Sequence, residues 1–208
     1  MTKYTVITGD VIQSRKYNNI SKKLKNNLKE INYPDNMVIP FSISRGDEIQ
    51  AVFRGSLVFP NLIREIRYKL NNIDIRFGIG FGEINEENFE INSWNMNGSA
   101  FHNARESLEE IEKDNKFKTI FKSGYKIDEA INTLLFLIDS FQAEWTDAQW
   151  EAIYYYEKEG TYQNAAEKLN IAFQNVEKRC KAAKWKEVEL AEKTINNLIG
   201  DFILVEGE

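Results

Sequence analysis

Two short segments in the first quarter of the chain carry the carboxylates that are best placed to do chemistry. Asp10 closes the segment ITGD, and Asp47 lies inside the segment RGDE. Carboxylates that meet in the folded protein can hold divalent cations, and a two-metal site assists phosphoryl transfer by clamping the attacking and leaving oxygens. Asp is also common beside Gly in ordinary turns, so a purely local role for both residues stays open. The chemistry therefore depends on whether the fold brings Asp10 and Asp47 together.

The pattern of apolar residues predicts the elements that would position this pair. Alternating β-branched residues predict a first strand over residues 4–8, and a helix with one apolar face follows over residues 21–31. Further along we expect a hairpin of two strands, a helix and a fourth strand, over residues 37–43, 49–53, 60–70 and 73–84. This βαββαβ order is the ferredoxin-like arrangement. Right-handed crossovers place its first and third strands side by side and antiparallel, so we expect Asp10 beside Asp47.

The fourth strand carries glycines at alternate positions. Gly78, Gly80 and Gly82 point to one face, whereas the residues between them are apolar and point to the other. Three glycines in such a row leave a bare trough of backbone, which suits the close approach of a ligand or of a second subunit. Packing against the loop that follows, around residues 94–96, is the alternative interpretation.

Two further helices and a short strand are expected before the C-terminal part. A helix begins near Gly98 and carries His102, the only histidine of the chain. His102 is a candidate ligand or proton carrier, although a structural role is the preferred interpretation. A short strand is expected over residues 118–122. The helix predicted over residues 128–141 is apolar nearly all round, which indicates burial between two domains or in a dimer contact.

The C-terminal part of the chain has helical signals only. Thr146 is expected to cap a helix that Gly160 ends, and Thr161 is expected to cap a second helix. After a short turn at residues 170–171, a third helix is predicted over residues 172–183. This spacing is that of a helix-turn-helix, in which the second helix of the pair enters the major groove of DNA. A three-helix bundle that binds another protein is the alternative.

The third of these helices is basic although the chain as a whole is acidic. The chain has a net charge of −5, while residues 172–186 hold five basic residues and one acidic residue, which gives +4 for this window and −9 for the remainder. A local excess of positive charge is typical of a phosphate-binding surface. Base contacts are expected near the start of the helix and phosphate contacts further along. The candidates for base contacts are Ala172, Phe173, Gln174, Asn175 and Lys178, and those for phosphate contacts are Arg179, Lys181 and Lys184.

Four N-terminal motifs resemble those of class III nucleotidyl cyclases and, more distantly, of GGDEF diguanylate cyclases. They are ITGD, RGDE, RFGIGFGE and GSAFHNAR, in this order along the chain. The resemblance implies that Asp10 and Asp47 bind Mg²⁺ or Mn²⁺. It also makes Gly9, Arg45 and Arg105 candidates for contacts to the phosphates of a purine nucleotide.

The helix that begins at Gly98 departs from the cyclase pattern. Cyclases carry an Asn four residues after the glycine and an Arg eight residues after it, where this chain has His102 and Glu106. An acidic residue that faces a triphosphate would repel it. A degenerate site that senses a nucleotide is therefore favoured over an active enzyme.

Over its whole length the chain resembles the SatD family of bacterial proteins. Members of this family combine the same four motifs with a C-terminal helix-turn-helix, and the resemblance extends from Tyr4 to about Leu198. It implies an α+β architecture in three parts. A ferredoxin-like, cyclase-like palm domain covers residues 1–126, a connecting helix residues 127–143, and an all-α helix-turn-helix domain residues 144–208.

Composition and motifs together set the functional expectation. The single cysteine excludes an internal disulfide, and no apolar run reaches the roughly 18 residues of a membrane span, so we expect a soluble cytoplasmic protein. We further expect a homodimeric, DNA-binding transcription regulator whose palm domain senses a nucleotide. An active nucleotidyl cyclase or related phosphoryl-transfer enzyme and a protein-interaction adaptor are the alternatives.

Overall fold

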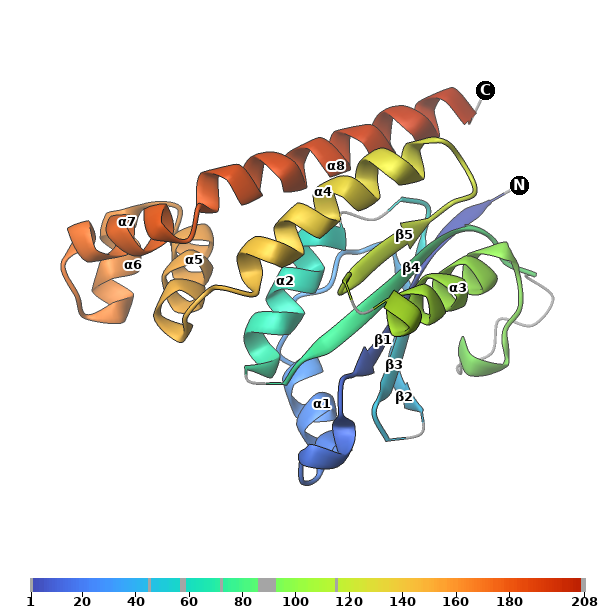
Figure 1. The fold of residues 1–208 in the computed structure, drawn as a ribbon, viewed down its shortest axis with the longest axis horizontal. Coiled ribbons are helices and arrows are strands. Elements are labelled where there is room, and N and C mark those ends of the chain that lie inside the picture. The colour runs from blue at the N-terminus through green and yellow to red at the C-terminus, as the bar shows by residue number, and fades with distance from the viewer. Residues whose placement is uncertain are drawn as a thin grey trace.

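The chain folds into an α+β protein in which a five-stranded sheet carries helices on both faces (Figure 1). The computed structural model describes residues 2–44, 46–56, 59–71, 73–85, 93–114 and 116–206, with only the backbone described at residue 95 and over residues 202–206. The strands are β1 (Lys3–Val11), β2 (Met37–Ser44), β3 (Glu48–Arg54), β4 (Ile75–Glu83) and β5 (Thr119–Lys122). The helices are α1 (Ile20–Leu28), α2 (Phe59–Leu70), α3 (Ser99–Asp114), α4 (Ile127–Gln142), α5 (Asp147–Glu159), α6 (Tyr162–Leu169), α7 (Phe173–Ala182) and α8 (Trp185–Glu206).

β1 lies in the middle of the sheet, whose strand order is β2-β3-β1-β4-β5. It is antiparallel to both β3 and β4, while β5 is parallel to β4. The prediction that the first and third strands are antiparallel neighbours is therefore confirmed. In this register Asp10 lies opposite Glu48 on one side and opposite Arg76 on the other. Charged residues thus flank the polar end of β1 on both neighbouring strands.

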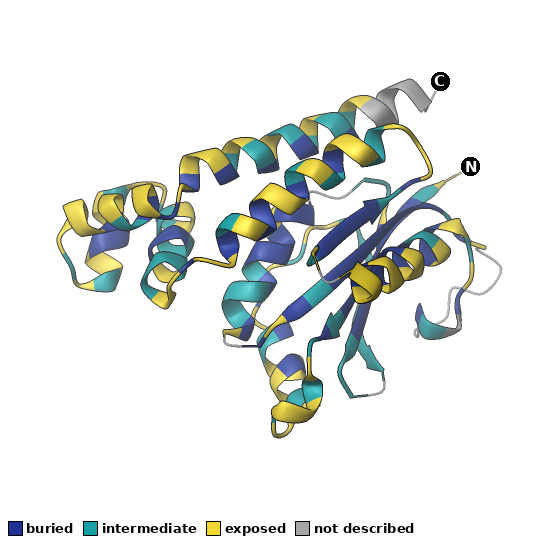
Figure 2. Cartoon of the chain, viewed as in Figure 1, coloured by how far each residue is buried: buried dark blue, intermediate teal, exposed yellow. Residues whose placement is uncertain are grey.

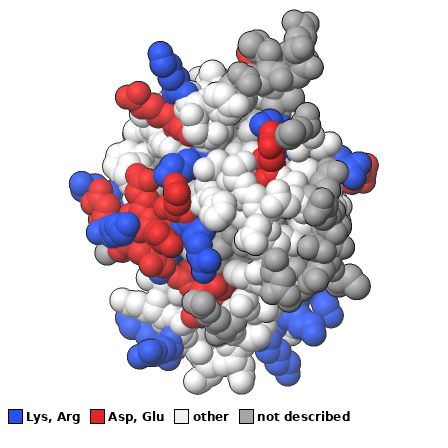
Figure 3. Space-filling view, turned by 90° about the vertical axis from the view of Figure 1, so that its right-hand side faces the viewer, with Lys and Arg blue, Asp and Glu red and all other residues white. Residues whose placement is uncertain are grey.

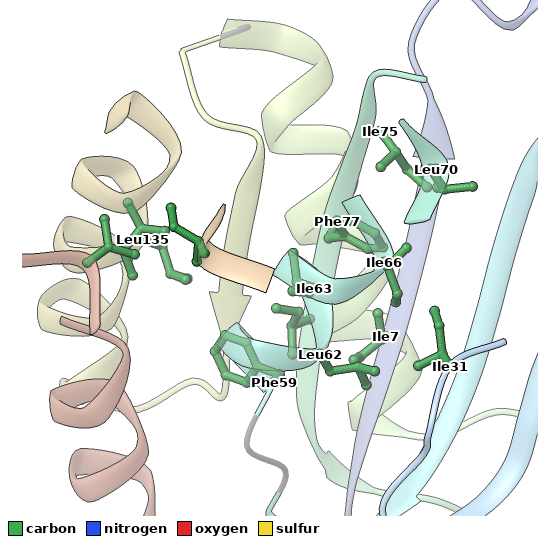
Figure 4. Close-up of a cluster of buried hydrophobic side chains, with 14 of the residues drawn as sticks. Ile7, Ile31, Phe59, Leu62, Ile63, Ile66, Leu70, Ile75, Phe77 and Leu135 are labelled. Carbon is green, nitrogen blue, oxygen red and sulfur yellow. The ribbon is translucent and has the colours of Figure 1, made fainter. Parts of the chain in front are cut away.

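The face of the sheet that carries α1 and α2 holds the larger hydrophobic core. Ile7 of β1 and Phe77 of β4 are fully buried on this face. Figure 4 shows them beside Phe59, Ile63 and Ile66 of α2, which belong to the same cluster. Because successive side chains of a strand point to opposite faces, the apolar residues of β4 in this core alternate with Arg76 and the glycines on the other face. Full burial of one such side chain stabilises a fold by about 1.5–3 kcal/mol.

The opposite face of the sheet is covered by α3, which lies directly on the glycines of β4. A Cβ atom at Gly78 or Gly80 would meet the backbone of Ala104 or Ala100 well inside van der Waals distance. The glycines therefore allow close packing between helix and strand. The prediction of an open trough for a ligand or a second subunit is wrong, because α3 fills it. The loop residue Met96 joins α3 in the small cluster on this face.

Replacing Gly80 by Ala is expected to destabilise the protein, because the added methyl group would push α3 away from β4. We expect the free energy of unfolding to fall by about 1–3 kcal/mol, the range typical of overpacked cores. Urea denaturation followed by circular dichroism measures this change.

Gly200→Ala in α8 is the matched control for this substitution. Nothing lies within 4 Å of a Cβ atom at Gly200, so the same change should stabilise α8 by about 0.5–1 kcal/mol. Equal effects of the two substitutions would contradict the packing role assigned to Gly80.

α4 and α8 run side by side along one edge of the molecule (Figure 1) and are in direct contact. The inner side of α4 carries the buried residues Ile131, Leu135 and Ile138, whereas Phe136 and Leu137 are 38% and 45% exposed. The outer sides of both helices are largely exposed in Figure 2. The predicted burial of α4 thus holds for one side only, and a dimer contact on its exposed side stays a prediction.

α2 is tied to the C-terminal helices by ion pairs inside a hydrophobic cluster that extends from β1 to α8. Arg64 of α2 is only 4% exposed and donates to Glu192 of α8 from Nε at 2.8 Å and from Nη2 at 3.2 Å. Glu157 of α5 forms a second ion pair with Arg64, and the guanidinium lies 4.6 Å from the ring centre of Trp185. Although burial lowers the pKa of Arg64, the two carboxylates raise it above its ordinary value, so the guanidinium stays charged.

Removing one partner of this buried pair is expected to be costly. Glu192→Ala would leave Arg64 without its main counter-charge, and we expect a loss of about 3–5 kcal/mol in the free energy of unfolding. Glu189→Ala is the control on the same helix, since its exposed pair with Lys193 contributes about 0–1 kcal/mol. Thermal and urea unfolding compare the two variants. A Glu192→Ala protein as stable as Glu189→Ala would overturn the importance of this ion pair.

Candidate functional site

Asp10 and Asp47 come together at the end of β1, as the strand order predicts. The backbone N–H of Val11 donates to the carbonyl oxygen of Asp47 at 3.4 Å. Burial raises the pKa of Asp10 above its ordinary value, and the carboxylate of Asp47 adds to this effect, although Arg76 acts in the opposite direction. The two acidic residues therefore lie in one electrostatic environment.

The carboxylate of Asp10 is already engaged by a cation of the chain. Arg76 of β4 donates to Oδ2 of Asp10 from Nε at 2.9 Å and from Nη2 at 2.6 Å. The same Nη2 also donates to Glu112 of α3 at 2.9 Å. A metal ion would therefore have to compete with Arg76 for the carboxylate of Asp10.

The described residues around Asp10 and Asp47 do not supply a complete set of metal ligands. Among the residues that the structure describes, no group of three or more Asp, Glu, His or Cys side chains is arranged to hold a metal ion. That Asp10 and Asp47 bind Mg²⁺ or Mn²⁺ stays a prediction. Water and phosphate oxygens would complete the coordination shell of the ion. Arg45, a predicted phosphate contact, lies outside the described residues.

Gly9 serves the core of the sheet. A Cβ atom at this position would lie 2.9 Å from side-chain atoms of both Ile49 and Phe77. These side chains belong to the core beneath α1 and α2. Because Gly9 and Asp10 are consecutive in a strand, they point to opposite faces of the sheet. Gly9 therefore faces the core, on the side of the sheet opposite to the side chain of Asp10.

α3 turns its two predicted site residues away from the sheet. His102 is exposed, and the side chain of Arg105 is 71% exposed and lies 4.0 Å from Glu109. Between them Asn103 turns toward β4, and its Nδ2 donates to the carbonyl oxygen of Phe81 at 2.9 Å. Each residue turns a helix by about 100°, so a displacement of one position decides which side chain reaches the sheet. The structure does not bring His102 or Arg105 to Asp10.

The outer side of α3 belongs to an acidic part of the surface. Its exposed positions include Glu106, Glu109 and Glu110. Figure 3 views the molecule from the right-hand side of Figure 1, where α3 lies, and acidic side chains gather over one part of this view. A surface with this charge repels phosphate, so neither DNA nor a nucleotide is expected to bind there.

A buried polar pair beside Asp10 was not among the predicted site residues. Gln50 of β3 donates from Nε2 to Oγ1 of Thr8 at 2.9 Å, and both residues are buried. The Oε1 atom of Gln50 is buried and has no hydrogen-bond partner among the described residues. The signal in the sequence is the run of polar residues at alternate positions, Thr8 and Asp10 on β1 opposite Glu48 and Gln50 on β3.

The helices α5, α6 and α7 begin and end within one residue of the predicted positions, whereas α8 was not predicted. Thr146 and Gln149 form a reciprocal capping box at the start of α5, and Gly160 ends this helix in a left-handed conformation with φ of 77°. The side chain of Thr161 accepts from the N–H of Asn164 at 3.1 Å and caps α6. Asn170 adopts a left-handed conformation with φ of 51° in the turn that leads to α7, which Asn tolerates better than other residues with a Cβ atom.

Small and apolar residues hold α6 and α7 together. Ala165 and Ala166 of α6 are buried, as are Val176 and Cys180 of α7. Small side chains on α6 let the two helices approach closely at their crossing. Burial raises the pKa of Cys180 to about 11, so its thiol stays protonated and unreactive.

The outward side of α7 carries four of the five predicted base contacts and the predicted phosphate contact Lys181. Phe173 is 47% exposed at the start of the helix. Gln174, Asn175, Lys178 and Lys181 are also exposed. The structure brings these five side chains to solvent on one short helix.

Two of the predicted phosphate contacts are engaged within the chain. Arg179 lies 3.9 Å from Glu151 of α5, and its side chain is 31% exposed. The Nζ atom of Lys184 lies 5.2 Å from the ring centre of Phe141 on α4. Arg179 and Lys184 are thus each held by a weak contact to a side chain of α5 or α4.

These features define an α+β protein in which a sheet with helices on both faces is joined to a C-terminal group of helices. The model of the SatD family matches residues 4–199, and the chain belongs to this family. No curated protein matches the sequence of the chain. None of the helices that the structure describes is long and apolar enough to span a membrane.

Removing Arg76 is expected to strengthen metal binding at the end of β1. In Arg76→Ala the carboxylate of Asp10 loses its competing cation, so Mn²⁺ should raise the melting temperature more than it does in the wild type. A thermal-shift titration with MnCl₂ measures the difference, and the double variant Asp10→Asn/Arg76→Ala is the control that lacks the ligand. An equal response of Arg76→Ala and the double variant would exclude Asp10 as a metal ligand.

Proposed function

We propose that this SatD protein is a DNA-binding transcription regulator in which α6 and α7 form a helix-turn-helix. The observation that supports this proposal is the outward face of α7, which carries Phe173, Gln174, Asn175, Lys178 and Lys181 at the end of a tight turn. In a helix-turn-helix the second helix lies in the major groove, and residues near its N-terminus contact the base edges.

The types of side chain on α7 suit different parts of DNA. Gln174 and Asn175 are able to donate to and accept from base edges in the major groove, while Phe173 can contact the methyl group of thymine. Lys178, which was predicted from the sequence to contact bases, lies further along the helix than Asn175 and is proposed to reach a phosphate, as is Lys181. Phosphate contacts position the protein without reading the sequence. The acidic side of α3 would stay away from the duplex.

The sheet part is proposed to act as a sensor domain with a ferredoxin-like palm. Its first four strands have the order β2-β3-β1-β4, which a βαββαβ chain with right-handed crossovers produces. A nucleotide bound with Mg²⁺ or Mn²⁺ at Asp10 and Asp47 would have to displace Arg76 from Asp10. Such an exchange of partners offers a switch, since Arg76 also holds Glu112 of α3.

A sensing role fits the geometry better than phosphoryl transfer. His102 and Arg105 face solvent on the outer side of α3, so neither is placed to stabilise a transition state at Asp10. An active nucleotidyl cyclase is therefore not favoured. The protein is proposed to act as a homodimer, because two copies of α7 would read two half-sites about one turn of DNA apart.

Lys178→Ala and Lys181→Ala are each expected to weaken binding to duplex DNA. Each change removes one phosphate contact, so the slope of the logarithm of affinity against the logarithm of salt concentration should fall by about 1. Fluorescence anisotropy with a labelled random-sequence duplex, measured from low to moderate salt, gives both the affinity and the slope.

Lys22→Ala on α1 is the control, since it removes the same charge from an exposed position that is far from α7 in the sequence. It should leave affinity and slope unchanged. Absence of duplex binding by the wild type at low salt would contradict the proposal and favour a protein-interaction adaptor.

A further inference from the structure

A cleft of about 490 Å³ lies where the sheet part meets the C-terminal helices. Its walls are the end of α2, the start of β4, the end of α4 and the first two turns of α5. Side chains from both parts of the chain therefore line one cavity, and we name it the α2–α5 cleft. A ligand held there would contact the helical part and the sheet part at the same time.

The charges that line the cleft do not cancel. Arg67 donates to Asp139 at 2.7 Å, and Lys118 donates to Asp74 at 2.6 Å, so these two cations are each neutralised by a carboxylate. Arg67 is further occupied by neighbouring side-chain oxygens of α4 and β5. Among the described residues of the lining, no cation is therefore left over for an anionic ligand.

Two carboxylates of α5 remain in the lining after this pairing. Asp147 is exposed and has no ion-pair partner among the described residues. Glu151 lies one turn further along α5 and has only a weak contact of 3.9 Å with Arg179. The N-terminus of α5 already has a carboxylate in its first turn, Asp147, so it offers little attraction to an anionic ligand. The cleft is thus electrostatically suited to a cation.

Aromatic rings form the remaining wall of the cleft. Tyr68 of α2 is half-buried and stacks on Tyr154 of α5 at a centroid distance of 4.1 Å. Trp150 of α5 is half-buried and meets the buried ring of Trp145 edge-on at 4.7 Å. Aromatic faces attract organic cations through the ring quadrupole and cover their alkyl groups at the same time.

We infer that the α2–α5 cleft binds a small organic ammonium ion. Asp147 and Glu151 pair with the ammonium group or groups, and the rings of Tyr68 and Trp150 contact the alkyl part. A metal ion would leave the apolar area of these rings unused, and an anion would meet the carboxylates of Asp147 and Glu151, of which only Glu151 has a cation near it. The combination of rings and carboxylates therefore selects the class of ligand.

The same cleft is linked to α7 through Glu151. A bound ammonium ion competes with Arg179 for this carboxylate, and Arg179 was predicted from the sequence to contact phosphate. Ligand binding would release Arg179 for DNA, and DNA would in turn favour ligand binding, because such coupling is reciprocal. This second step rests on the proposed function, whereas binding of the ammonium ion does not.

Binding is tested without DNA by tryptophan fluorescence, since Trp145 and Trp150 both line the cleft. Choline and putrescine are the probes, with one and two ammonium groups, titrated at constant ionic strength against NaCl. Saturable quenching is expected for the wild type. Asp147→Asn/Glu151→Gln should weaken it by about tenfold or more, because both counter-charges are lost.

Glu129→Gln on α4 is the matched control, because it removes an exposed carboxylate that does not line the cleft. It should bind both probes as the wild type does, and circular dichroism checks that all variants are folded. Absence of saturable quenching in the wild type, or equal affinity in the wild type and the double variant, would overturn the inference.

The link to DNA is tested with a double-mutant cycle. Glu151→Gln should increase the affinity for a low-salt duplex in the wild-type background but not in the Arg179→Ala background. Choline should likewise increase duplex affinity in the wild type and not in Glu151→Gln. Equal effects in both backgrounds would disprove the link through Arg179, while the fluorescence result would still decide ligand binding.

Discussion

The arrangement of the two parts of the chain depends on the buried guanidinium of Arg64. A charge taken out of water needs counter-charges and hydrogen bonds, or it destabilises the fold by several kcal/mol. Glu192 of α8 and Glu157 of α5 supply them, and Trp185 covers the guanidinium. These three residues come from the C-terminal helices, so those helices must return to α2 for the protein to fold.

The second arginine of α2 extends this constraint to the neighbouring elements. Arg67 lies three residues after Arg64, hence on nearly the same side of the helix, and it bonds to Asp139 and Gln142 of α4 and to Thr119 of β5. One helix therefore holds the sheet, α4, α5 and α8 in a fixed relation. Arg67, Asp139 and Gln142 of this network line the α2–α5 cleft, so a ligand there would contact both parts of the chain.

The covering of the sheet by α3 limits where ligands are able to bind. Close packing on the glycines of β4 removes the trough that the alternation of Gly78 and Gly80 suggested. What stays polar is the end of β1, where Arg76 joins Asp10 to Glu112. Nucleotide sensing at that end and ammonium binding in the cleft are thus separate proposals, at sites built by different elements.

The sequence by itself determined the features that depend on neighbours in the chain or on topology. The caps at Thr146 and Thr161 and the turn at residues 170–171 are local, and they were predicted at the correct residues. The meeting of Asp10 with Asp47 followed from strand order, because few topologies satisfy right-handed crossovers.

The tertiary structure alone decided which side chains meet across elements. The pairing of Arg76 with Asp10 and of Glu151 with Arg179 joins residues far apart in the chain, and no local pattern encodes such a partner. The outward direction of His102 was equally hidden, since a rotation of α3 by one residue, about 100°, would have reversed it. Local signals set where helices begin and end, whereas packing sets their rotation and hence their chemistry.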